Sequence, residues 1–421
     1  MKIFQDAIKN LETVLEYHEL PDHIDGVSAR IFRNLRRIDY AIKRTRRHKF
    51  KIPKWQMNIL RVGVYLATID KDFQTEIAVN TAVELAKSRG GQKSAGFVNA
   101  SLRRITANYK LISTPSPDNF RAYLAILHSH PDFLVNRWIH RFDKKTVQNI
   151  LSLNNRYAPR YFRVNQYMTT LEELYEILNT QNVDYELHPK LDNFFKLLSP
   201  EIKTHDWDLL KGGMVVVQDP GFEAASICLA PKPTDRILEI GCAPGGKTSR
   251  LVEMTDGQAE IIAIDSNEER LYLAESNLRR MKMNDVKFIY ADGRDYRDKD
   301  KFDKVLVDPP CTSFGVIRRH PEIKWLRQES DIERLSHLQK SIAVNAMENV
   351  RVGGLLVWST CTTEPEENEE MVRYMLSFGD FEVVNAFYEP LRDIREKPFY
   401  RPSPIYGDYD GGFCATLRKI R

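Results

Sequence analysis

The chain has 421 residues, of which 42% are hydrophobic and 29% are charged, and this ordinary globular composition excludes a disordered or fibrous protein. Its length predicts two to four domains. Five cysteines are too few for a disulfide scaffold, and no pair has zinc-ligand spacing, so we expect a reducing, cytoplasmic compartment. No window approaches the roughly 20 apolar residues that span a bilayer, so we expect neither secretion nor membrane insertion.

Positive charge is concentrated near the N-terminus. The whole chain carries only +4, but residues 30–54 hold eleven Lys and Arg against one acid, Asp39. Clustered cations displace counterions from a phosphate backbone, which makes this run a candidate contact for nucleic acid. A solvated helical face explains a charge run equally well.

Apolar residues recur at helical spacing over residues 1–109. We therefore predict an all-α domain over 1–112, followed by a break at 113–119 that contains two prolines. A helical stretch at 120–155 lies in a connector that we assign to 113–159. Short strand-like pieces and one helix at 170–180 then predict a small α/β domain over 160–214.

Apolar strands alternate with helical segments from residue 215 to the end. We predict strands at residues 236–240, 261–265, 287–291, 304–308 and 355–359. This alternation is typical of βαβ units in a doubly wound parallel sheet, and it predicts a Rossmann-like α/β domain over 215–421.

A glycine-rich turn follows the first of these strands and admits two interpretations. Residues 241–248 satisfy the P-loop pattern, and Asp308 ends a strand as a magnesium-binding acid does, so a P-loop ATPase is a competing hypothesis. However, Pro244 lacks the N–H that a phosphate cradle needs. Asp265, twenty residues after Gly245, is instead placed to bind both ribose hydroxyls of S-adenosylmethionine or a dinucleotide.

A further acid, Asp292, ends the third strand and could accept a hydrogen bond from an adenine amino group. A helix or turn cap is its structural alternative.

Two cysteines follow neighbouring strands. Cys311 comes after Asp308-Pro-Pro, and Cys361 comes after Ser359-Thr360. Carboxyl ends of parallel strands meet at one sheet edge, so we expect the two thiols to share a site beside the cofactor loop. The remaining cysteines, which we interpret as structural, are Cys228, Cys242 and Cys414.

A thiol beside a methyl donor has a chemical rationale. Carbon 5 of a pyrimidine is a poor nucleophile, but attack of a thiolate at carbon 6 converts the ring into an enamine that can be methylated there. Removal of the carbon 5 proton then needs an acid/base group, and Asp308 is placed to hydrogen-bond the base edge. Methylation of an exocyclic amine would need no thiol and typically places an aromatic residue where this chain has Cys311.

These motifs resemble the RNA cytosine carbon-5 methyltransferase family. The matching segments are residues 239–248, 263–265, 291–292, 308–311 and 359–369. The resemblance implies that Cys361 is the nucleophile and that Cys311 assists product release, an order that the residues alone do not give. It also implies that S-adenosylmethionine is the cofactor and that no metal is needed. The implied cofactor-binding residues are Gly241, Cys242, Ala243, Pro244, Gly245, Gly246, Lys247, Asp265, Asp292 and Asp308. Lys247 could instead point at the target base, and we count it with Asp308 among the catalytic candidates.

The resemblance extends to the bacterial small-subunit (16S) ribosomal RNA branch, whose N-terminal domain is like the transcription factor NusB. Its marks are residues 77–80, 97–104, 129–131, 163–165, 217–219 and 318–325. This branch implies a helical RNA-binding domain, a small ferredoxin-like or RRM-like domain and a Rossmann-like catalytic domain. The chain departs from the usual family pattern at Glu239, at Gly241-Cys242, at Pro309 and at residues 220–223.

Together these patterns predict a monomeric methyltransferase that acts on carbon 5 of a cytosine in ribosomal RNA. We expect RNA contacts from Arg30, Arg33, Arg36, Arg37, Arg44, Arg46, Arg47, Arg318, Arg319 and Lys324. The alternatives are a transfer RNA cytosine methyltransferase, a P-loop ATPase acting on RNA, and a catalytically silent RNA-binding assembly factor.

Overall fold

The computed structural model describes residues 1–21, 24–45 and 51–421. The chain forms two compact units, one of Met1–Arg156 with Ile317–Glu329 and the other of Tyr157–Val316 with Ser330–Arg421. No helix within the described ranges is long and apolar enough to cross a bilayer.

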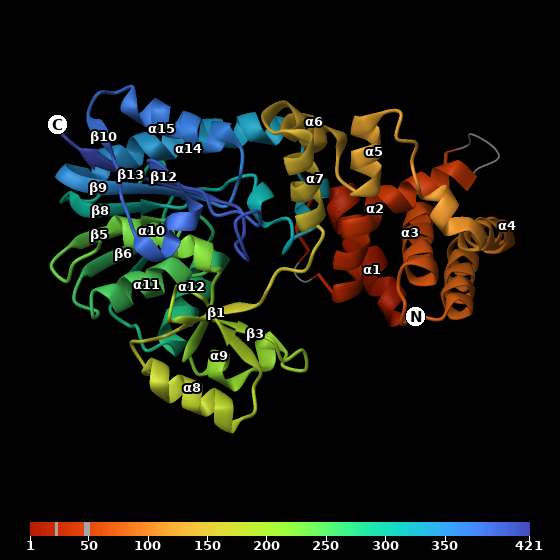
Figure 1. Cartoon of the computed structure of the whole chain (residues 1–421), viewed down its shortest axis with the longest axis horizontal. Helices are drawn as coiled ribbons and strands as arrows, with labels where there is room; N and C mark the ends of the chain where they lie inside the picture. The colour runs from red at the N-terminus through yellow and green to blue at the C-terminus, as the bar shows by residue number, and fades with distance from the viewer. Residues whose placement is uncertain (22–23, 46–50) are drawn as a thin grey trace. The chain divides into compact units, whose positions relative to one another are not determined.

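The first unit is helical, as predicted for its N-terminal part (Figure 1). Its helices are α1 (Lys2–Glu12), α2 (Gly26–Thr45), α3 (Lys54–Thr68), α4 (Thr75–Ile112), α5 (Phe120–Leu127), α6 (Asp132–Arg141) and α7 (Lys144–Leu153), with a π-helical turn η1 (Thr13–Tyr17) after α1. Helix α3 buries most of its residues and is the centre of the core. Gly91, with φ +69°, kinks α4 because only glycine adopts this conformation readily.

An excursion from the C-terminal half of the chain completes this core. Ile317–Glu329 leaves the second unit and contains the short helix α13 (Ile323–Leu326). Leu326 belongs to the helical core, and Trp325 donates its Nε1–H to the carbonyl of Phe32 at 2.7 Å. The sequence interpretation placed these residues within a continuous catalytic domain over 215–421. They belong instead to the helical unit, a long-range pairing that local periodicity does not report.

The second unit begins with the predicted small α/β domain. Its elements are β1 (Tyr161–Val164), α8 (Leu171–Thr180), β2 (Tyr185–Leu187), β3 (Phe194–Leu197), a 3-10 turn η2 (Thr204–Asp206), α9 (Asp208–Lys211) and β4 (Val215–Val217). The antiparallel order β2-β3-β1-β4 is that of a ferredoxin-like fold. A capping box between Thr170 and Glu173 starts α8 at the predicted residue, since both side chains satisfy free backbone amides there.

The catalytic part of the second unit is a nine-stranded sheet in the order β11-β12-β13-β9-β8-β5-β6-β7, with β10 also paired to β13. Its strands are β5 (Arg236–Ile240), β6 (Glu260–Asp265), β7 (Lys287–Tyr290), β8 (Phe302–Val307), β9 (Val350–Thr360), β10 (Phe381–Val384), β11 (Arg395–Glu396), β12 (Phe399–Tyr400) and β13 (Phe413–Lys419). The helices are α10 (Glu223–Leu229), α11 (Gly246–Met254), α12 (Glu268–Arg280), α14 (Glu329–Asn349) and α15 (Glu369–Leu376), and the 3-10 turns are η3 (Pro220–Phe222), η4 (Phe314–Val316), η5 (Pro365–Glu367) and η6 (Glu389–Ile394).

The five predicted strands are confirmed as the parallel part of this sheet, from β7 to β9. The expectation of an all-parallel sheet is wrong, because β13 runs antiparallel to β9. An apolar run such as Phe413–Lys419 indicates a buried strand but not its direction. Helices α10, α11 and α12 cover one face of the sheet, and α14 and α15 cover the other (Figure 1).

We expect Trp325→Ala to destabilise the helical unit. A buried aromatic truncated to alanine costs about 3 to 5 kcal/mol, and Trp325 is half-buried, so a loss of about 2 kcal/mol in the free energy of unfolding is expected. Trp325→Phe keeps most of the packing and loses the hydrogen bond, which costs about 1 kcal/mol. Urea unfolding of the full chain, followed by circular dichroism, measures both. If Trp325→Ala and Trp325→Phe had the same free energy of unfolding, Trp325 would not be packed into the helical core as described.

Candidate active site

The loop between β5 and α11 is shaped by a close approach of two strand ends. Gly241 has φ +83°, and a Cβ placed there would lie 2.1 Å from the carbonyl oxygen of Asp308. A side chain is therefore excluded at Gly241, the first residue of the Gly241-Cys242 departure. The amides of Gly241 and Cys242 donate to the carbonyl of Ile264, at 2.9 and 3.1 Å. Because these amides are used within the sheet, they cannot cradle a phosphate, which argues against the P-loop interpretation.

Helix α12 fixes the rest of this loop. Arg270 donates to the carbonyl of Ala243 at 3.0 Å, and Asn277 donates to that of Pro244 at 2.9 Å. Gly245, with φ +97°, lies against Leu278 of the same helix. The sequence interpretation missed Arg270 and Asn277, because nothing in their local pattern distinguishes them from surface residues of an amphipathic helix.

Three acids stand at the carboxyl ends of neighbouring strands. Asp265 is buried and accepts from the amides of Asn267 (3.0 Å) and Ala243 (3.4 Å). Asp292 is partly exposed and forms an ion pair with Arg294 at 2.6 Å. Glu239 is 1% exposed, and burial raises its pKa to about 7.

This arrangement fits S-adenosylmethionine. Among the described residues, Glu239 Oε2 has no hydrogen-bond partner, so a buried carboxylate oxygen awaits a donor or a cation beside the glycine loop. S-adenosylmethionine carries a sulfonium, an ammonium, two ribose hydroxyls and an adenine amino group. Glu239 would face its cationic end, Asp265 would accept from the ribose hydroxyls and Asp292 from the adenine, as expected from the strand order.

Lys247, at the start of α11, forms an ion pair with Asp308, which follows β8. Its Nζ lies 2.5 Å from Oδ2 of Asp308 and 5.7 Å from the centre of the Phe222 ring. Burial alone would lower the pKa of Lys247, but the charge of Asp308 and the hydrogen bond to it outweigh burial and raise that pKa. The structure thus pairs the two residues predicted to face the target base. Phe222, from the unusual segment 220–223, also lies beside Lys247.

The two predicted thiols lie side by side. Cys311 Sγ and Cys361 Sγ are 3.2 Å apart, both cysteines are free, and Ser313 Oγ lies 3.3 Å from Cys361 Sγ. A hydrogen bond from the Cys311 thiol lowers the pKa of Cys361, and the same contact raises the pKa of Cys311. Of the two thiols, Cys361 is therefore the one that ionises more readily, and its role as nucleophile stays a prediction. Sequence reasoning did not identify Ser313.

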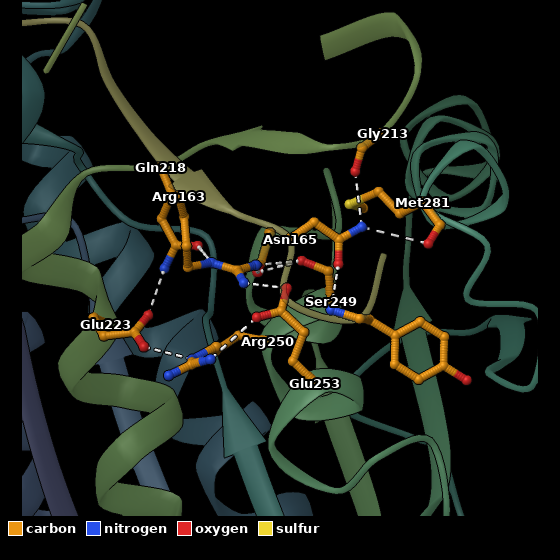
Figure 2. A network of polar contacts seen from close by, with 11 residues as sticks. Arg163, Asn165, Gly213, Gln218, Glu223, Ser249, Arg250, Glu253 and Met281 are labelled. Carbon is orange, nitrogen blue, oxygen red and sulfur yellow. Dashed lines mark hydrogen bonds and ion pairs between the residues drawn. The ribbon is translucent and has the colours of Figure 1, made fainter. Parts of the chain in front are cut away.

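A buried polar network joins the small domain to the cofactor helix (Figure 2). Arg163 of β1 forms an ion pair with Glu253 and donates to Ser249 Oγ (2.8 Å) and Gly246 O (3.4 Å), all on α11. Arg163 is fully buried, so each of these contacts is shielded from water. It thereby fixes the helix whose first turn carries the end of the glycine loop and Lys247.

The unusual segment 220–223 enters the same network (Figure 2). Glu223 pairs with Arg250 at 2.6 Å and accepts from Gln218 Nε2 at 3.2 Å. Arg250 also pairs with Glu253 at 3.1 Å. Within this segment, the chain therefore uses a buried acid, Glu223, that neutralises a cation of α11.

The residues predicted to contact RNA fall into separate groups. Arg33 and Lys324 are buried, with Arg33 donating to the carbonyl of Arg318 (2.8 Å) and Lys324 to Asn155 Oδ1 (3.1 Å). Arg318 is buried as well, and Arg319 is half-buried. The prediction that Arg33, Arg318 and Lys324 hold an RNA backbone is thus contradicted by their burial, since a phosphate contact needs an accessible cation.

The other predicted RNA contacts that the structure describes lie on α2. Arg30 and Arg36 form ion pairs with Asp70 (3.6 Å) and Asp132 (2.6 Å). Arg37 lies over the ring of Tyr109 and Arg44 over that of Tyr40. Arg46 and Arg47 lie outside the described residues.

We expect the Arg163–Glu253 pair to be strongly coupled. Arg163→Met leaves a buried acid without its main partner, and breaking a buried pair from one side costs about 3 to 5 kcal/mol of unfolding free energy. Adding Glu253→Met should restore part of that loss, because the orphaned charge is removed. A double-mutant cycle by urea unfolding measures the coupling. Additive losses would contradict a direct interaction.

The thiol pair predicts a pH dependence of alkylation. A thiolate forms as pH rises through its pKa, so iodoacetamide should modify Cys361 with a midpoint below that of an ordinary cysteine thiol. Cys311→Ala removes the donor and should move this midpoint to higher pH, whereas Cys311→Ser retains a donor and should move it less. Mass spectrometry of the Cys361 peptide across pH provides the measurement. An unchanged midpoint in Cys311→Ala would exclude the hydrogen bond as the cause.

Comparison with known proteins agrees with this geometry. Residues 226–418 match a family model described as 16S rRNA methyltransferase RsmB/F, residues 2–107 match the NusB family, and residues 130–202 match the RsmF/B-like ferredoxin-like domain. The chain is 32% identical to ribosomal RNA small subunit methyltransferase B of Vibrio vulnificus, over 81% of this chain and 78% of that protein. It is 29% identical to a probable ribosomal RNA small subunit methyltransferase B of Bacillus subtilis, over 97% and 94%.

The fold is also found among solved structures. The crystal structure of PH0851 superposes with a TM-score of 0.81 and 25% identity, over 93% of this chain and 89% of that one. The methyl donor of this methyltransferase family is S-adenosylmethionine, in agreement with the cofactor expected from the glycine loop and the acids. From its catalytic domain, its NusB-like domain and its identity to the Vibrio protein, the chain belongs to the RsmB/F family of 16S rRNA methyltransferases.

Proposed function

We propose that this protein methylates carbon 5 of a cytosine in small-subunit ribosomal RNA through a covalent adduct between Cys361 Sγ and carbon 6. The observation that carries the proposal is the pair of free thiols 3.2 Å apart at one sheet edge. A methyltransferase that modified an amine or a hydroxyl would have no use for a thiolate there. The charges of Lys247 and Asp308 act on the same thiolate, so the four groups form one site.

The reaction begins with addition of the Cys361 thiolate to carbon 6. The sulfur electron pair forms the new C–S bond, and the electrons of the carbon 5–carbon 6 double bond move toward carbon 5 and ring nitrogen 3. When bound, S-adenosylmethionine supplies an electrophilic methyl group to carbon 5. Loss of the carbon 5 proton re-forms the double bond and returns the C–S electron pair to sulfur.

Lys247 and Asp308 have complementary roles on the base edge. A cytosine offers an amino group and an acceptor nitrogen side by side. Asp308, which pairs with the ammonium 2.5 Å away, would accept from the amino group. Lys247 would donate to nitrogen 3, where negative charge develops as the thiolate adds. The pair thus favours addition to cytosine over uracil, which has no amino donor at that position.

The RNA substrate follows from the relatives and from the helical unit. Both curated relatives are named as small-subunit ribosomal RNA methyltransferases, and the N-terminal unit matches the NusB family. The basic run at 30–54 adds an electrostatic attraction for phosphate, with Arg30, Arg36, Arg37 and Arg44 as its described candidates. A transfer RNA remains the alternative substrate.

We expect labelled 5-methylcytidine after incubation with deproteinised 16S rRNA and S-adenosylmethionine labelled in its methyl group. Digestion of the RNA and chromatography of the nucleosides identify the product. Cys361→Ala should abolish transfer, because no adduct can form, and Cys311→Ala should leave a denaturant-stable protein–RNA adduct. Ser377→Ala, in an exposed segment after α15, serves as the control.

Several results would contradict the proposal. Label in another nucleoside would exclude carbon 5 chemistry, and full transfer by Cys361→Ala would exclude its role. Label in transfer RNA but not in 16S rRNA would assign the alternative substrate. Binding of S-adenosylmethionine without transfer to either RNA would favour a silent assembly factor.

A further inference from the structure

A buried carboxylate lies behind the two thiols and is not used in the chemistry above. Glu367 ends η5 and is fully buried. Its Oε1 accepts from the amide of Thr312 at 2.9 Å, and its Oε2 accepts from the hydroxyl of the same residue. Thr312 directly follows Cys311, so Glu367 holds the backbone on the C-terminal side of that thiol.

Gln339 of α14 holds the backbone on the N-terminal side of Cys311. Its Nε2 donates to Glu367 Oε1 and to the carbonyl of Pro310, both at 2.9 Å. Pro310 directly precedes Cys311. The carboxylate of Glu367, together with the amide of Gln339, therefore fixes both neighbours of Cys311.

The next residue does the same for the other thiol. Asn368 Nδ2 donates to the carbonyl of Thr362 at 3.0 Å, and its Oδ1 accepts from the hydroxyl of Thr360 at 2.6 Å. These two threonines flank Cys361. Asn368 is 1% exposed, so these bonds do not compete with water.

The dipeptide itself is anchored to the sheet. The indole N–H of Trp358, in β9, donates to the backbone carbonyl of Glu367 at 3.0 Å. The hydroxyls of Thr312 and Thr362 lie 2.7 Å apart, which ties the two thiol loops to one another. Two adjacent residues of one turn thus grip two loops that are 50 residues apart in the chain.

We propose that Glu367 and Asn368 are positioning residues with separate duties: Glu367 holds Cys311 for product release, and Asn368 holds Cys361 for addition. The inference rests on the proposed function, because it assigns each residue to one half of the covalent cycle. Neither side chain touches the base or the cofactor in this scheme. Each acts through the backbone of the thiol that it fixes.

The release step shows why the position of Cys311 matters. The carbon 5–hydrogen bond breaks, its electrons form the carbon 5–carbon 6 double bond, and the carbon 6–sulfur bond breaks with its electron pair left on Cys361. The proton passes to Cys311 Sγ as the proton of Cys311 passes to Cys361 Sγ, so protons and charge balance. This exchange needs the two sulfurs to stay at the 3.2 Å separation that the turn maintains.

The experiment compares full-chain Glu367→Gln and Asn368→Ala with Cys311→Ala and with Glu370→Gln, which changes an exposed acid of α15 three residues after Glu367. Glutamine keeps the shape of Glu367 but replaces one acceptor oxygen with an NH2 group: at the Oε1 position this group faces the donors Thr312 N–H and Gln339 Nε2, and at the Oε2 position it forces the Thr312 hydroxyl to reverse and donate to Thr362, so either orientation disturbs the hydrogen bonds around Thr312. Each protein is incubated with S-adenosylmethionine and 16S rRNA. Denaturing gels measure the protein–RNA adduct, and nucleoside analysis measures released 5-methylcytidine.

We expect Glu367→Gln to accumulate adduct severalfold above the wild-type level, as Cys311→Ala does, while its first methyl transfer proceeds. In a Cys311→Ala background, Asn368→Ala should slow adduct formation about tenfold or more, whereas Glu367→Gln should change it little. Glu370→Gln should match the wild type in both readouts. Gln339→Met, which loses only the contacts to Glu367 and Pro310, should also accumulate adduct, and it serves if Glu367→Gln does not fold.

A folded Glu367→Gln that loses transfer without accumulating adduct, beside a Cys311→Ala protein that does accumulate it, would overturn the inference and leave the proposed function intact. Equal effects of Glu367→Gln and Asn368→Ala on both steps would also overturn it, because that is the result of a general loss of structure. No adduct in Cys311→Ala would refute the proposed release role, and the assignment of Glu367 would fall with it.

Discussion

The site depends on how closely the carboxyl ends of β5 and β8 converge. The backbone of Gly241 meets the carbonyl of Asp308 with no room for a side chain, and this contact brings the cofactor loop against the strand that leads to the thiols. On one side of the contact are the glycine loop and α11, and on the other are Asp308 and Cys311. Lys247 closes the junction by reaching from α11 to Asp308. The glycine loop, the Lys247–Asp308 pair and the two thiols are therefore brought together by backbone packing.

Much of this arrangement could be predicted because it is local. The five parallel strands, the glycine loop, Asp265 and both thiols follow from periodicity and from residues at strand ends. What the sequence could not supply are contacts between distant segments. Three residues reach the thiols from other elements: Glu367, Gln339 and Ser313. Arg33 is buried because it packs against a segment almost 300 residues away, and Lys324 is buried because it packs against the end of α7. The sequence of a motif does not show whether its Lys or Arg side chain faces a phosphate or a backbone carbonyl.

The small domain has a role that its fold alone does not suggest. In an RRM-like sheet, the face opposite the helices is the one on which bases stack. Here that face carries Arg163, which is fully buried against α11 (Figure 2). Phe162 and Val164 of the same strand pack with α8. The sheet is therefore a support for the cofactor helix rather than an open RNA platform. The unusual Glu223 belongs to the same support, since it neutralises Arg250 of that helix.

Because of the excursion Ile317–Glu329, the helical unit is joined to the rest of the chain at more than one point. The polypeptide passes between the two units at three places, after Arg156, before Ile317 and after Glu329, so a single linker does not join them. A protein trimmed to its catalytic part would keep Trp325 and Leu326 but lose the helices that cover them. Such a truncation would expose these apolar side chains in a segment that begins six residues after Cys311. Residues 317–329 thus belong to the helical unit although the chain on both sides of them belongs to the other unit, and a cut at residue 156 would not separate the two units in sequence.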